Sequence, residues 1–137
     1  MPAIVDTSAL MALVRAREPQ HASVVQAIST EPGLLVVPLT VVVEAGQLIA
    51  RRLGAAAEAA WLSRLLSGRW VIEPSPVADL ARAAELIAQY RDADLGLVDA
   101  TIVAMAERLG VVRLYTLDRR DFGIVRPRHV AAFELLP

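Results

Sequence analysis

Hydrophobic residues along the chain occur in short continuous runs that alternate with longer segments of helical periodicity. The runs are rich in Val, Leu and Ile, which is typical of strands that a parallel sheet buries on both faces. The longer segments repeat apolar residues every three or four positions, as amphipathic helices do. Strands are predicted at residues 3–5, 34–37, 70–72, 111–117 and 131–136, and helices at 9–17, 21–28, 40–52, 55–66, 77–90 and 98–109. This order predicts one three-layer α/β/α domain over residues 1–137, with a central, mainly parallel sheet flanked by helices.

The first strand ends abruptly at Asp6, which is followed by the hydroxyl residues Thr7 and Ser8. Functional sites assemble at the carboxyl ends of parallel strands, so Asp6 is a candidate ligand of such a site. A carboxylate in this position can equally cap the helix that follows. Because Ser8 is also a good N-cap, the sequence favours Ser8 as the cap and leaves Asp6 for the site.

Two further acids are candidates for the same site. Asp118 follows the strand at 111–117, and its alternative role is that of a turn or cap residue. Asp99 shares a helical face with Ile102 and Val103, where a carboxylate is costly unless it is paired or binds a metal. The alternative for Asp99 is a favourable position near the positive end of the helix dipole. Charged residues on the other faces of these helices are expected to point outward: Asp79, Arg82, Glu85, Glu107 and Arg108.

Glu44 is a lone acid between a run of three Val residues and Ala45. It either joins the same site or forms a buried ion pair with a distant Arg. Asp94 is a weaker candidate, because an acid in the predicted loop at 91–96 is usually solvated. Four carboxylates without Cys or His form a hard oxygen site that suits Mg²⁺ or Mn²⁺ rather than Zn²⁺. Such ions can activate water for phosphodiester hydrolysis, whereas His21 and His129 are expected at the surface.

Composition excludes several other kinds of chemistry. All 14 basic residues are Arg, and the absence of Lys excludes P-loop NTPases, Schiff-base enzymes and phosphatases that hold an aspartyl-phosphate beside a Lys. The absence of Cys excludes disulfides and thiolate chemistry and favours a cytoplasmic location. A net charge of −1 gives no broad basic surface. No signal peptide is expected, and no apolar run approaches the roughly 20 residues of a membrane span.

Four segments together resemble the motifs of a known family. They are IVDTSAL at 4–10, the lone Glu44 in the third helix, LGLVDA at 95–100 and YTLDRRDF at 115–122. Their order and spacing are similar to those of PIN-domain proteins and, more narrowly, of the VapC ribonuclease toxins of bacterial VapBC toxin–antitoxin pairs. Each motif is weak alone, but the ordered set spans essentially the whole chain and is specific.

The resemblance implies an endoribonuclease, the toxin of a type II toxin–antitoxin pair, that depends on Mg²⁺ or Mn²⁺. Its catalytic acids would be Asp6, Glu44, Asp99 and Asp118, with Asp6, Asp99 and Asp118 expected first as metal ligands. Asp94 would be an accessory acid, and Ser8 or Thr116 a hydroxyl that orients the carboxylates. The substrate would be structured RNA such as tRNA or rRNA.

The resemblance also implies partners. A small VapB-like antitoxin would silence the toxin in a hetero-oligomer, and DNA would be contacted only through the antitoxin. The resemblance also implies a homodimer, and the high apolar content and the face formed by Trp61, Leu62 and Leu65 fit that expectation. RNA needs basic contacts, and eight Arg residues are candidates to rim an acidic pocket, although most are expected to be ordinary surface charge. They are Arg15, Arg17, Arg51, Arg52, Arg119, Arg120, Arg126 and Arg128. The strongest candidates are Arg119 and Arg120, beside Asp118.

Two other classes of function compete with this interpretation. One is a regulatory binding module of PIN-like fold without turnover, against which the full set of four acids argues. The other is a different Mg²⁺ enzyme on a similar sheet, such as a phosphatase with Asp6 as nucleophile, against which the missing Lys argues.

Overall fold

In the computed structural model, which describes residues 1–137, five short strands form one parallel sheet. They are β1 (Ala3–Val5), β2 (Leu35–Pro38), β3 (Trp70–Glu73), β4 (Arg113–Tyr115) and β5 (Glu134–Leu136). Their order in the sheet is β3-β2-β1-β4-β5, and all four pairings are parallel. β1 therefore lies at the centre with all three residues buried, and the prediction of a mainly parallel sheet is confirmed.

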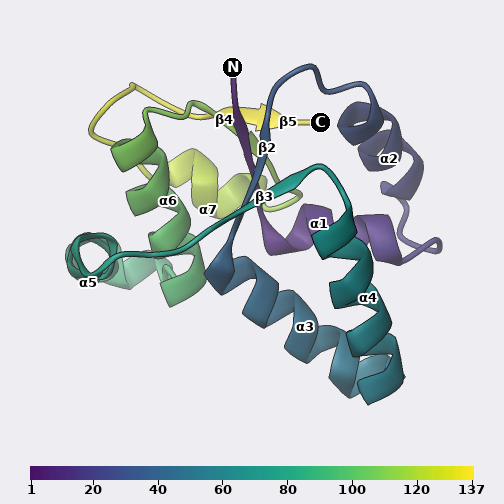
Figure 1. Ribbon diagram of the computed structural model, residues 1–137. Helices are drawn as coiled ribbons and strands as arrows, with labels where there is room; N and C mark the ends of the chain where they lie inside the picture. Colours follow the sequence, from purple (N-terminus) through teal and green to yellow (C-terminus); the bar gives the residue numbers. More distant parts are fainter.

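Helices cover the sheet on both sides. They are α1 (Thr7–Val14), α2 (His21–Ser29), α3 (Leu39–Leu53), α4 (Ala55–Ser67), α5 (Val77–Gln89), α6 (Leu97–Leu109) and α7 (Arg119–Ile124), with a short 3₁₀ turn η1 at Arg91–Ala93. α5 and α6 lie to one side of the strands, and α1 and α2 to the other (Figure 1). α3 and α4 form a helical hairpin whose turn is at Gly54, where φ is +90° and glycine is favoured.

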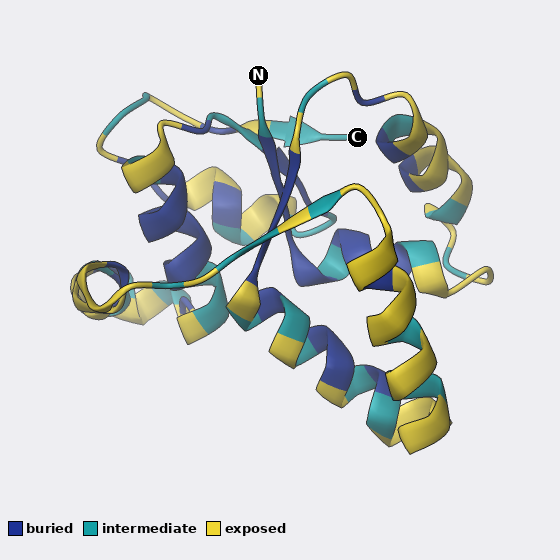
Figure 2. Cartoon of the chain, viewed as in Figure 1, coloured by how far each residue is buried: buried dark blue, intermediate teal, exposed yellow.

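The core lies where the central strands meet α6 and the inward faces of α1 and α3. Figure 2 shows the central strands and the middle of α6 as buried, whereas much of α4 is exposed. α6 buries seven consecutive residues, Ala100 to Ala106. A helix that is apolar around most of its surface is one that other elements enclose, and α6 packs against both α5 and α3.

The structure corrects the predicted strand at 111–117 and the helix N-terminus near Ser8. β4 has only three residues, and the segment after Asp118 forms the short helix α7, which the apolar pattern did not indicate. The first helix begins at Thr7 and its N-cap is Asp6. Ser8 is a helical residue whose hydroxyl donates to Asp6 Oδ2 instead of capping the helix. Asp6 thus takes the cap role that the sequence assigned to Ser8.

Of the charged residues expected to point outward from α5 and α6, Glu85 and Arg108 are exposed, whereas Asp79, Arg82 and Glu107 are less exposed and join the two helices. Asp79 is buried and accepts hydrogen bonds from Arg108 Nε at 2.9 and 3.1 Å. Arg82 donates to both carboxylate oxygens of Glu107, at 2.7 and 3.0 Å. These pairs satisfy charges that the close packing of α5 against α6 partly removes from water.

An apolar cavity of about 470 Å³ is lined by residues of α1, α3 and α4. Its lining includes Leu13 of α1, Leu53 of α3, and Trp61 and Leu65 of α4. Leu65 is buried, so it is not part of a free outer face as the sequence suggested, whereas Trp61 is half-buried and packs against the core. Leu62 keeps an exposed fraction of 37 %. No helix in the structure has the length and apolar character needed to cross a membrane.

Candidate active site and metal centre

Asp6 is held at the carboxyl end of β1 by three hydrogen bonds. Its Oδ1 accepts from the Thr7 amide at 2.7 Å, and its Oδ2 accepts from Ser8 Oγ at 2.9 Å and from Thr116 Oγ1 at 2.8 Å. The side chain is almost fully buried. A carboxylate offers about four acceptor positions, so one remains for a further ligand.

The hydroxyl groups of Ser8 and Thr116 connect the ends of β1 and β4. Ser8 Oγ accepts from the Leu117 amide at 2.9 Å, and Thr116 Oγ1 accepts from the Asp118 amide at 2.9 Å. Both hydroxyls also donate to Asp6. The position of Asp118 is therefore fixed relative to Asp6 by side chains from two neighbouring strand ends, which matches the orienting role expected for these hydroxyls.

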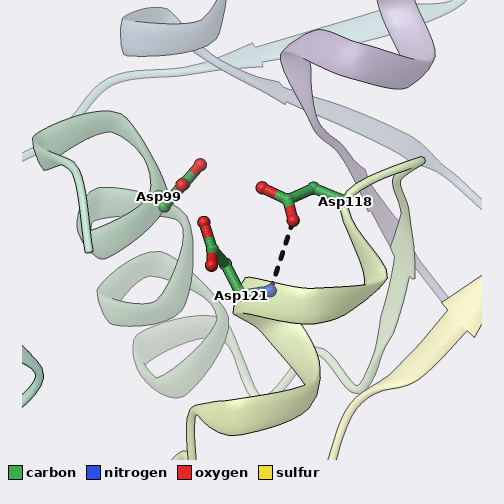
Figure 3. A group of neighbouring side chains, drawn as sticks. All are labelled: Asp99, Asp118 and Asp121. Atoms are coloured by element: carbon green, nitrogen blue, oxygen red, sulfur yellow. Dashed lines mark hydrogen bonds between the residues drawn. The ribbon is translucent and has the colours of Figure 1, made fainter. Parts of the chain in front are cut away.

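Asp99, Asp118 and Asp121 bring their carboxylates together beside this network. One oxygen from each side chain lies within 4.8 Å of the others. Figure 3 shows Asp99 pointing from α6 toward the two acids of the α7 segment, with the Asp121 amide donating to Asp118 Oδ1 at 3.2 Å. Asp6 and Glu44 lie outside this tight group but line the same pocket as Asp99 and Asp118.

Asp121 is the site residue that the sequence analysis missed. It stands three positions after Asp118, the N-cap of α7, in the spacing of a capping box. Two acids in this spacing lie on the same side of the first helical turn. The Asp-Arg-Arg-Asp sequence contained this signal, but it was hidden because the segment was taken as the end of a strand.

Burial and mutual repulsion raise the pKa values of several carboxyl groups at this site. Burial raises the pKa of Asp99 to about 7, and the charges of Asp6, Asp118, Asp121 and Glu44 add to the effect. Burial also raises the pKa of Asp6, although its three hydrogen bonds act in the opposite direction. The pKa of Asp121 is raised by burial and by Asp118. Strongly shifted acids that converge in one pocket are characteristic of functional sites.

Glu44 reaches the pocket from α3. It is half-buried and makes no ion pair with any Arg, so the alternative of a structural pair is wrong. One turn before it, Thr40 Oγ1 lies 2.9 Å from Thr101 Oγ1 of α6, a contact that fixes the helix of Glu44 against that of Asp99. Asp94 is exposed in a left-handed conformation, with φ of +54°. Its charge contributes to raising the pKa of Asp121, so it lies near the margin of the cluster.

The donor set fits a hard divalent cation. Mg²⁺ and Mn²⁺ prefer oxygen ligands, carboxylates above all, and three carboxylate oxygens lie within 4.8 Å of one another here. A cation would also relieve the repulsion that raises the Asp99 pKa. The Thr7 hydroxyl lines the pocket, is buried and has no hydrogen-bond partner. Such an atom needs a ligand or an ordered water beside it.

The pocket has a volume of about 540 Å³, within the range of small-ligand sites. Besides the acids, its lining contains Arg15 at the end of α1 and Arg52 in the last turn of α3. Arg119 and Arg120 do not line it, and Arg119 Nη2 donates to the Pro137 carbonyl at 2.6 Å. Arg120 lies near enough to lower the pKa of Asp121, so it borders the cluster from outside.

Neither His belongs to the pocket. His21 Nδ1 lies 2.6 Å from the Ala12 carbonyl, and His129 Nε2 lies 2.6 Å from the Val111 carbonyl. Both rings are half-buried and bound to the backbone, so they are less solvated than the sequence suggested. The site chemistry is therefore that of carboxylates alone.

The chain matches known proteins over nearly its full length. The model of the PIN domain matches residues 3–126. Ribonuclease VapC26 of Mycobacterium tuberculosis (strain ATCC 25618 / H37Rv) is 39 % identical over 134 residues, which cover 98 % of this chain and 99 % of that protein.

Solved structures show the same fold. The crystal structure of Mycobacterium tuberculosis VapC20, described as a sarcin–ricin loop cleaving toxin, has a TM-score of 0.82 and 26 % identity, covering 94 % of this chain and 98 % of that one. A toxin–antitoxin complex from Klebsiella pneumoniae has a TM-score of 0.67 and 25 % identity, covering 93 % of this chain and 99 % of that one.

Proposed function

The chain belongs to the PIN-domain family, and on that premise we propose that it is a VapC-type toxin that hydrolyses RNA phosphodiester bonds. The observation that carries the proposal is the convergence of the four predicted acids, Asp6, Glu44, Asp99 and Asp118, on one pocket at the carboxyl edge of the sheet. The identity to a named ribonuclease over 98 % of the chain supports it.

The carboxylates are proposed to hold Mg²⁺ or Mn²⁺. Asp99, Asp118 and Asp121 would supply the clustered oxygens, and Asp6 and Glu44, which line the same pocket as Asp99 and Asp118, would contribute further oxygens. When bound, a divalent ion supplies a Lewis acid that activates water and stabilises the leaving oxygen. Ser8 and Thr116 hold the Asp6 carboxylate in one orientation, and Asp94 is an accessory acid at the margin.

The proposed partners are RNA and an antitoxin. A structured RNA such as tRNA or rRNA is the substrate, which places the protein in the cytoplasm, and the whole chain 1–137 acts as one domain. A VapB-like antitoxin would silence it within a hetero-oligomer that contains a toxin homodimer. Support comes from the likeness to the Klebsiella pneumoniae toxin–antitoxin complex.

The decisive experiment is cleavage of RNA by the purified protein with Mg²⁺, with Mn²⁺ and with EDTA, followed by mapping of the new RNA ends. Cleavage is expected only with a divalent ion. Asp6→Asn and Asp99→Asn should abolish both cleavage and growth inhibition while the circular dichroism spectrum stays unchanged. Asp92→Asn is the matched control, because Asp92 is exposed and lies outside the pocket.

Two outcomes would count against the proposal. Undiminished cleavage by Asp99→Asn would remove the catalytic assignment of the pocket. Absence of both Mn²⁺ binding and RNA cleavage in the wild-type protein would favour a binding module instead.

Co-expression of a small DNA-binding protein encoded beside the gene should suppress toxicity if the antitoxin assignment is correct.

A further inference from the structure

An acidic pocket repels the RNA that it is proposed to cut. Its lining carries five carboxylates: Asp6, Glu18, Glu44, Asp99 and Asp118. RNA carries a negative charge on every phosphate, and proteins that bind it neutralise several phosphates with basic side chains. Metal ions at the reacting phosphate would leave the neighbouring phosphates facing carboxylates, so cationic side chains are needed beside the pocket.

Half of the 14 Arg residues of this chain are already engaged elsewhere. Four form ion pairs and three donate to backbone carbonyls: Arg82, Arg108, Arg113 and Arg128 in the first group, and Arg69, Arg119 and Arg126 in the second. Of the remaining seven, only Arg15 and Arg52 line the acidic pocket. Neither makes an ion pair or a side-chain hydrogen bond within the chain.

Arg15 and Arg52 also line a second cavity, one that contains no acidic residue. The other residues that line this small cavity are Met11, Val14, Ile49 and Leu53. Arg15 and Arg52 come from the C-terminal ends of two helices, α1 and α3, that pack against each other. Because Met11, Arg15 and Arg52 line both cavities, the two Arg residues lie where the acidic pocket adjoins this small apolar cavity.

We propose that Arg15 and Arg52 together bind the phosphates of the RNA strand next to the bond that is cut. The proposal rests on the ribonuclease function proposed above and names the residues that position its substrate. A guanidinium matches two phosphate oxygens at once and keeps its charge at any physiological pH. No aromatic side chain lines the pocket, so bases have no stacking platform there and the contact is with the backbone.

The test compares two double variants with equal loss of charge. Arg15→Gln/Arg52→Gln removes both Arg residues that line the pocket, whereas Arg64→Gln/Arg91→Gln removes two exposed Arg residues that do not line it. For a short single-stranded RNA, the first variant should raise KM at least about tenfold and leave kcat within about twofold. The salt slope of binding should fall by about 1.4 for two lost phosphate contacts. The control should match the wild type in all three values.

Binding can be measured separately from cleavage. In an Asp99→Asn background, the Kd for the same RNA should rise by the same factor in Arg15→Gln/Arg52→Gln, and Arg15→Lys/Arg52→Lys should recover part of it because the charges return. Equal KM and Kd in the two double variants, with equal thermal midpoints, would overturn the inference. A lower kcat with unchanged KM would also overturn it. Failure of the wild type to cleave RNA would instead contradict the proposed function, since the Kd comparison does not depend on turnover.

Discussion

Thr116 Oγ1 donates a hydrogen bond of 2.8 Å to Asp6 Oδ2, across 110 positions of the sequence. The contact joins the carboxyl ends of β1 and β4, which are neighbours in the sheet. Thr116 also accepts from the Asp118 amide at 2.9 Å. One hydroxyl thus sets the relative positions of two acids that come from opposite ends of the chain.

Thr116→Val should disturb the site through Asp6. The hydrogen bond from Thr116 lowers the Asp6 pKa, so its loss raises that pKa and leaves the carboxylate free to turn. We expect a loss of activity of roughly 10- to 100-fold and a shift of the acid limb of the pH–rate profile to higher pH. Thr116→Ser keeps the hydroxyl and should retain the wild-type profile. Equal profiles for the Val and Ser variants would contradict the assigned role.

Asp99 should make the metal-free protein less stable as the pH rises. Its folded pKa of about 7 lies above the ordinary value of 3.8, so the folded state holds more protons between these values. The free energy of unfolding therefore falls from about pH 4 to pH 7, by at most about 1.4 kcal/mol per pH unit and less where solvent screens the group. Urea unfolding in EDTA at pH 5, 6 and 7 should show this slope, flattened in Asp99→Asn and by added Mg²⁺. The same slope in both proteins would be inconsistent with the cluster electrostatics.

Asp121 should be needed for the metal although the family motifs did not single it out. Its carboxylate lies in the group whose oxygens approach within 4.8 Å. Asp121→Asn should weaken Mn²⁺ binding and reduce RNA cleavage by about 10- to 100-fold. Calorimetric titration of Mn²⁺ measures the first effect and initial rates the second, with Asp92→Asn as the exposed control. Unchanged Mn²⁺ affinity would exclude Asp121 from the metal ligands and leave it as a residue of the first turn of α7.

The ion pair between Arg113 of β4 and the buried Glu31 should contribute to stability. Arg113 donates to both oxygens of the buried Glu31 at 2.7 Å, and Tyr115 donates to the same carboxylate. These contacts, led by Arg113, lower the Glu31 pKa to about 2. Arg113→Gln leaves a buried charge without its partner and should cost about 3–5 kcal/mol in the free energy of unfolding at pH 7.

The same pair predicts a distinct acid transition. Because the folded pKa of Glu31 lies below its ordinary value of 4.5, its contribution is present above pH 4.5 and is lost as the pH falls toward 2. Denaturation of wild type and Arg113→Gln should therefore converge at low pH. Arg64→Gln, at an exposed position, should stay near the wild type throughout. A constant gap between wild type and Arg113→Gln down to pH 2 would contradict the pairing.

The class of fold and four acids of the pocket could be predicted from local patterns in the chain. Apolar runs and helical periodicity are local properties, so they placed every strand and all helices except α7 within a few residues. Asp6 and Asp118 were predictable as site residues because each follows a strand whose carboxyl end must lie at one edge of a parallel sheet. Asp99 was indicated because a lone carboxylate on an apolar helical face requires a partner.

Contacts between distant segments of the chain became visible in the folded structure alone. The strand order put β1 beside β4, so that Thr116 reaches Asp6. The fold of α7 turned Asp121 toward Asp99, and the packing of α1 on α3 brought Arg15 and Arg52 to one small cavity. The pairing of Asp79 with Arg108 likewise depended on how α5 meets α6. Sequence periodicity fixes which face of an element is apolar, but the partner of a polar side chain depends on contacts between elements far apart in the chain.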